Sequence, residues 1–162
     1  PPLSSGGNAY QRLSSFFPKI SQSLVAVLTT LDQSFGWLQS NQQKSFQELT
    51  AKSTLPANLC LDIFKWAIPL VPFVLTNVPA EVIGILTRYL VHMDKSVQER
   101  ATQTLSVMMQ QRPDLRPTIA TAAADFLLQI PDTRYEIVHS VLDKLNRLLK
   151  EWVALTAPAS TV

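Results

Sequence analysis

Two consecutive helical hairpins between Pro79 and Trp152 restrict the fold of this chain more than any other feature of its sequence. Each hairpin is a pair of amphipathic helices, and a proline opens the first helix of each pair. The starts at Pro79 and Pro117 set a period of about forty residues with two helices per unit. Such a period is typical of helical-repeat proteins, which usually act as binding surfaces.

The repeat predicts an all-α fold in which antiparallel helix pairs stack as a HEAT/armadillo-like α-solenoid fragment. A closed helical bundle is the alternative. Asp94 is the expected N-cap of the second helix, because its carboxylate can accept hydrogen bonds from the first turn. We expect Met108 and Met109 in the core, or else in an adaptable groove. The predicted division is a disordered tail over residues 1–8, an N-terminal helical segment with a proline-rich break over 9–78, two HEAT-like hairpins over 79–155, and a disordered tail over 156–162.

The N-terminal segment has a less regular pattern. An apolar stripe predicts a helix from Ile20 to Leu38, and the Gln-rich stretch from Asn41 to Lys52 is either a short helix or a loop. A further helix begins at Pro56, and Pro69 and Pro72 are expected to break it. Residues 68–79 could then form a kinked helix, two short helices or a buried loop. Trp66 and Phe73 are expected in the core.

Charge argues against nucleic-acid binding. The net charge is only +2, and the basic and acidic residues from Pro79 onward balance. A nucleic-acid-binding surface normally carries a basic stripe that neutralises phosphates. The apolar run from Ile63 to Val78 contains a lysine and two prolines and is shorter than the ~20 residues that span a bilayer. We therefore expect no membrane span.

The sequence contains no pattern typical of an enzyme. It has two histidines, His92 and His139, and one cysteine, Cys60. Their spacing fits no metal site, and no glycine-rich phosphate loop is present. Isolated histidines on amphipathic helices are usually solvated or capping, and His92 is expected at the end of its helix, where a partly cationic ring suits the helix dipole. A single cysteine cannot form an internal disulfide, which fits a reducing compartment. We expect a non-enzymatic cytoplasmic protein with no cofactor and no metal.

Two stretches carry a family resemblance. The first runs from Leu86 through the turn Val-His-Met-Asp to the break Arg-Pro-Asp-Leu-Arg116. The second begins with Phe126-Leu-Leu-Gln-Ile-Pro-Asp-Thr and closes at Glu151-Trp152. Over roughly residues 86–152 the chain resembles the Furry family of cell-morphogenesis scaffold proteins.

The resemblance implies a scaffold that supports cell morphogenesis and polarity. It implies an NDR-type kinase with its Mob coactivator as partner, together with neighbouring repeats of the same chain, and it gives no catalytic residues. The alternative is a HEAT-repeat fragment of another large assembly, such as a transport, trafficking or chromatin scaffold. A small all-α enzyme or ligand-binding bundle is a different class, but the sequence lacks the polar cluster that it would need.

Partner-binding residues follow from periodicity. The second helix of each pair commonly lines the concave surface of a solenoid, so its outward polar positions are the candidates. They are Lys95, Glu99 and Gln103 in one unit, and His139, Asp143 and Arg147 in the next.

Overall fold

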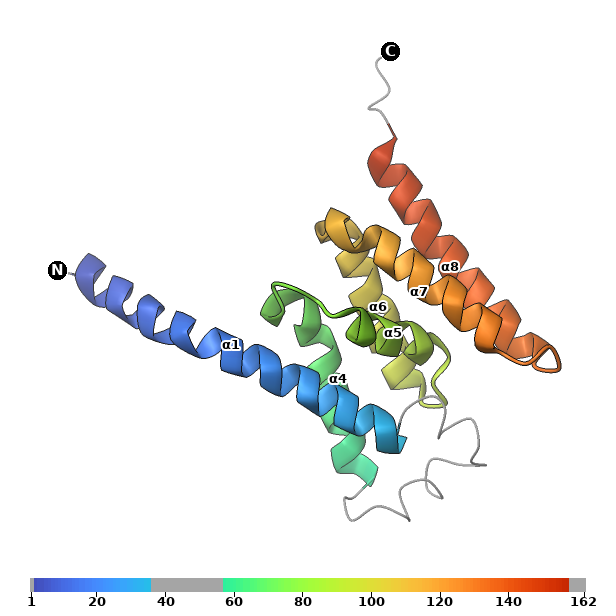
Figure 1. Cartoon of the computed structure of the whole chain (residues 1–162), viewed down its shortest axis with the longest axis horizontal. Helices are drawn as coiled ribbons and strands as arrows, with labels where there is room; N and C mark the ends of the chain where they lie inside the picture. Colours follow the sequence, from blue (N-terminus) through green and yellow to red (C-terminus); the bar gives the residue numbers. More distant parts are fainter. Residues whose placement is uncertain (1, 36–56, 158–162) are drawn as a thin grey trace.

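The computed structural model describes residues 2–35 and 57–157, and over them its only regular secondary structure is helical (Figure 1). Its six α-helices are α1 (Pro2–Phe35), α4 (Ala57–Val74), α5 (Ala80–Arg88), α6 (Lys95–Gln111), α7 (Arg116–Gln129) and α8 (Tyr135–Thr156). Two 3₁₀ turns, η1 (Tyr89–Val91) and η2 (Pro113–Leu115), follow α5 and precede α7. These two ranges contain no strand, which confirms the all-α prediction.

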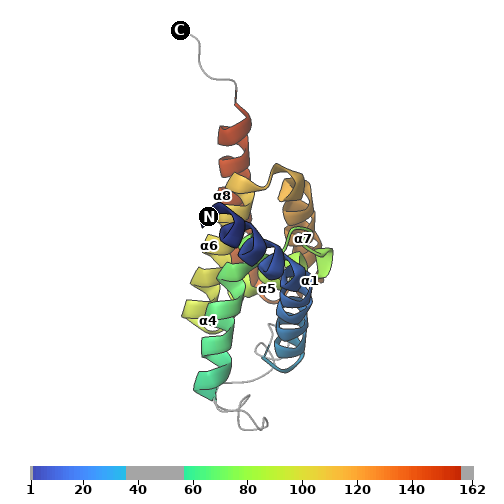
Figure 2. The same ribbon diagram turned by 90° about the vertical axis from the view of Figure 1, so that its left-hand side faces the viewer.

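The helices form two layers. Helices α1, α5 and α7 lie side by side in one layer, and α4, α6 and α8 lie side by side in the other (Figure 2). Across the layers α1 packs on α4, α5 on α6, and α7 on α8. Each pair therefore adds one helix to each layer and packs on the next pair, which is consistent with an α-solenoid.

The core lies between the layers and centres on α6. This helix packs on both α4 and α8, so its inward stripe is fully covered. Val97, Ala101, Leu105, Met108 and Met109 are all completely buried. Full burial of an aliphatic side chain of this size contributes about 1.5–3 kcal/mol. The prediction that both methionines belong to the core is confirmed.

Helix α4 continues through both of its prolines, so the predicted break there is wrong. The missing proline donors cost about 3 kcal/mol per residue in a helix interior. Phe64, Ile68 and Val71 on the same helix are completely buried against the rest of the core. Burial of these three side chains, at about 1.5–3 kcal/mol each, offsets a large part of the penalty. The prolines themselves lie off this stripe and are only half-buried.

Helix α1 is longer than the sequence pattern predicts. The expected disordered tail over residues 1–8 is helical from Pro2 onward. A proline suits the first turn of a helix, where its missing N–H would have no partner within the helix. At the other end, α8 continues to Thr156 before the chain leaves the helix. The predicted end of the first helix at Leu38 and the stretch from Asn41 to Lys52 lie outside the described residues.

The turn between α5 and α6 is held by two side chains. Asp94 accepts a hydrogen bond from the N–H of Val97 at 3.0 Å, as predicted for the N-cap. His92 lies at the end of the first helix, directly after η1, as predicted, and it is completely buried rather than solvated. Its Nδ1 accepts from the N–H of Asp94 at 3.1 Å, and its ring lies 5.3 Å from the ring of Tyr89. The turn folds the imidazole inward, where it packs like an aromatic core residue.

Candidate protein-binding site

A groove runs between α6 and α8, in the layer formed by the second helices of the pairs. Its volume is about 510 Å³. The lining combines an apolar floor with polar side chains from both helices. Its residues are Leu90, Thr102, Gln103, Ser106, Val107, Lys144, Arg147, Leu148 and Glu151. We refer to this feature as the α6–α8 groove.

Two polar links cross the groove. The Ser106 hydroxyl donates to the Glu151 carboxylate at 2.8 Å. Eight residues earlier on α6, the Gln98 amide oxygen accepts from the Lys144 ammonium at 3.5 Å. The later residue of α6, Ser106, bonds to the later residue of α8, Glu151. Helices α6 and α8 therefore run in the same direction. The links fix the spacing of the two helices and hence the width of the groove.

Lys144 is the most constrained charge in the groove. Its ammonium also donates to the backbone carbonyl of Leu90, at the end of η1. Partial burial and the nearby Arg147 guanidinium lower the pKa of Lys144, and the Asp143 carboxylate opposes that shift. These hydrogen bonds already restrict the Lys144 side chain, so less conformational entropy is lost when a partner binds.

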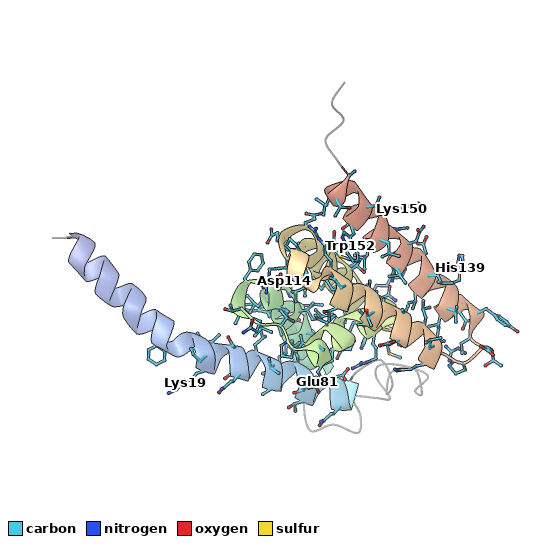
Figure 3. The ribbon with its side chains drawn as sticks, turned by 45° about the horizontal axis from the view of Figure 1, so that its top comes forward. Lys19, Glu81, Asp114, His139, Lys150 and Trp152 are labelled. Carbon is cyan, nitrogen blue, oxygen red and sulfur yellow. The ribbon has the colours of Figure 1, made fainter. Side chains whose placement is uncertain are left out.

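All six residues predicted to bind a partner are solvent-exposed. Gln103 and Arg147 are brought together, because both line the α6–α8 groove. Lys95, Glu99, His139 and Asp143 are not part of its lining. Asp143 forms an ion pair with Arg147 at 3.1 Å, at the i and i+4 positions of α8. Figure 3 shows His139 near the beginning of the same helix.

The sequence analysis missed four polar residues of the groove: Thr102, Ser106, Lys144 and Glu151. A signal for two of them was present in the spacing along α8. Lys144 and Glu151 fall three residues after Val141 and Leu148, which are both buried. Residues three apart share a helix face. Lys144 and Glu151 therefore lie on the same helix face as buried apolar residues, and a charged residue in that position indicates a polar contact with a neighbouring helix.

The described residues hold no cluster of metal-binding side chains. None of the described helices is both long and apolar enough to cross a membrane. The α6–α8 groove presents hydrogen-bond donors and acceptors on a helical support, together with Arg147, which pairs with Asp143 outside the lining. Such a surface can recognise another protein through polar side chains around an apolar floor.

The layered helices define a class: an all-helical protein whose stacked pairs are consistent with an α-solenoid. Residues 6–157 match the model of the family described as Cell morphogenesis N-terminal. The chain belongs to this family, which is the Furry-family domain. The match begins well before residue 86, so it also covers α1 and α4, where the sequence alone gave no motif. No solved structure gives a significant match to the chain.

Proposed function

We propose that the chain is a non-enzymatic scaffold segment of a Furry-like protein, with helix pairs stacked in the HEAT/armadillo manner. The family membership supports a role in cell morphogenesis. The observation that carries the scaffold proposal is the two-layered order of the helices, in which each pair packs on the next. Stacks of this kind present one continuous layer to partners.

The partner in this proposal is an NDR-type kinase with its Mob coactivator, in the cytoplasm, where the complex supports polarised growth. The α6–α8 groove and the exposed row Lys95, Glu99 and Gln103 on α6 form the contact surface. Their polar character favours recognition by hydrogen bonds and charge pairs. The balanced charge of this part of the chain supports a protein partner and gives no support to a nucleic acid.

Arg147 provides the test of this surface. We expect Arg147→Glu to weaken the capture of a purified Mob–kinase pair at least about tenfold, a change of about 1.4 kcal/mol. Arg147 is 72% exposed, and an exposed i, i+4 ion pair contributes only about 0.3–0.5 kcal/mol. The melting temperature should therefore change little.

Lys150→Glu is the matched control, because Lys150 is an exposed cation of the same helix outside the groove lining (Figure 3). Its binding should match that of the unmodified chain. Equal binding by the Arg147→Glu chain would contradict the proposed surface. Absence of capture by the unmodified chain would contradict the proposed partner.

A further inference from the structure

A second groove lies at the other end of the helix stack, between α1 and α4. Its volume is about 610 Å³, larger than that of the α6–α8 groove, and it is almost wholly apolar. On the α1 side it is lined by Phe16, Ile20, Leu24 and Val27, which follow one another at steps of four, four and three residues. That spacing places all four on one face of the helix. We refer to this feature as the α1–α4 groove.

Helix α4 contributes a matching row. Leu59, Ile63, Trp66 and Leu70 line the groove at steps of four, three and four residues. The opposite face of α4 already packs on α6. Helix α4 also packs on α1, but this contact leaves Leu59, Trp66 and Leu70 of the groove row exposed.

The exposed aromatic surface at this end is unusually large. Trp66 is 78% exposed, and its neighbour on α4, Phe73, is 72% exposed, so the prediction that they belong to the core is wrong. Each aromatic side chain of this kind can bury about 150–250 Å². Exposed aromatic residues that lie beside two aliphatic rows form a contiguous apolar patch, and such patches often mark interaction sites.

The two charged side chains of the groove lining have opposite signs and lie far apart. Lys19 belongs to α1 (Figure 3), and Asp62 belongs to the first turns of α4. The Ser21 hydroxyl donates to the Val74 carbonyl at 3.1 Å, so Lys19 lies near the end of α4. Twelve residues of helix separate Asp62 from Val74, a distance of about 18 Å.

These observations favour one kind of occupant. Two helices with apolar rows on either side of a hollow accept the ridge of a third helix. A second copy of this chain would place one hollow face on another and leave a void, which protein interfaces avoid. A membrane-binding face is normally rich in lysine and arginine, whereas this groove has one cation and one anion.

We propose that the α1–α4 groove docks an amphipathic α-helix of about three to four turns, the length of the two apolar rows. The docked helix places a basic side chain against Asp62 and an acidic side chain against Lys19. This site is separate from the α6–α8 groove and does not depend on the partner proposed there.

The probe is a fluorescent 16-residue helical peptide with leucines at heptad positions, a lysine near one end and a glutamate near the other. A second peptide carries glutamate at both ends. Fluorescence anisotropy with the full chain should show tighter binding of the lysine–glutamate peptide. Leu70→Asp should weaken its binding at least about tenfold. Leu128→Asp, at an exposed leucine of α7 outside the groove, should leave its binding unchanged.

Asp62→Lys gives a test that does not depend on the apolar packing. Asp62 is exposed, and thermal melts followed by circular dichroism check that the variant is folded. The variant groove carries two cations, so its preference should move to the glutamate–glutamate peptide. The proposal is overturned if the unmodified chain binds neither peptide, or if the preference does not change in this variant. It is also overturned if Leu70→Asp abolishes dimerisation or binding to phosphatidylserine vesicles while peptide binding persists.

Discussion

Tyr89 is the least satisfied polar residue of the core. Its ring is completely buried and lies 5.3 Å from the ring of Phe64, in an edge-on arrangement. Its hydroxyl has no hydrogen-bond partner among the described residues. Burial, followed by the nearby Asp32 carboxylate, raises the pKa of Tyr89 well above its ordinary value. The hydroxyl therefore stays protonated beside that carboxylate.

Tyr89→Phe should stabilise the fold. Removal of an unpaired buried hydroxyl, whose burial costs about 1–3 kcal/mol, should raise the free energy of unfolding by up to about 1 kcal/mol, measured by urea denaturation. Tyr135→Phe is the control, because Tyr135 is exposed. A loss of about 1 kcal/mol would mean that the hydroxyl bonds to Asp32, which in the structure pairs with Arg88 at 3.1 Å.

The sequence predicted some residues of the α6–α8 groove and missed others. Gln103 and Arg147 were found because exposed polar positions on a helix follow from its periodicity. Lys144 and Glu151 were missed because they occupy positions that the same periodicity assigns to the core. Their spacing marked them as charges beside a buried stripe, but it could not identify their partners, Gln98 and Ser106, on a helix about forty residues earlier.

At the scale of elements, α4 shows why local rules failed. Its two prolines argue for a break, and the local cost is real. The helix persists because its buried stripe packs against α6. The local sequence of α4 could not predict this contact with a distant helix. In contrast, the helices after Pro79 were predicted well, since their caps, breaks and apolar stripes all agree.

Pro72→Ala should therefore strengthen α4. The alanine restores an N–H that can donate to the carbonyl of Ile68, four residues earlier. The free energy of unfolding should rise by about 1–3 kcal/mol, below or at the full helix-interior penalty of proline. The control, Pro131→Ala, changes an exposed proline in the turn between α7 and α8 and should alter stability by less. A decrease for Pro72→Ala would show that the proline shapes the packing of α4.

At the scale of the whole molecule, the described residues form two hydrophobic clusters of unequal size. The larger one joins α1, α4, α5 and α6 and reaches α7 and α8 through Ile119 and Leu148. The smaller one consists of Phe126, Ile130 and Val141, near the turn between α7 and α8. A stack in which pairs contact only their neighbours should open from the pair with the smaller core.

Phe126→Ala tests this division. Loss of a buried phenylalanine typically costs about 3–5 kcal/mol. We expect faster hydrogen exchange in α7 and α8, with the amides of α4 and α6 still protected. Leu105→Ala, in the larger cluster, should raise exchange in every helix. Equal acceleration in all helices by Phe126→Ala would instead indicate a single cooperative unit.

The parallel course of α6 and α8 has a mechanical consequence. The links from Lys144 and from Glu151 to α6 lie about two helical turns apart along α8. A force applied along the axis of α8 loads both links at once, in shear. A force applied across that axis loads them one after the other, as in unzipping. The contact between α6 and α8 should therefore resist tension along the helices better than tension across them.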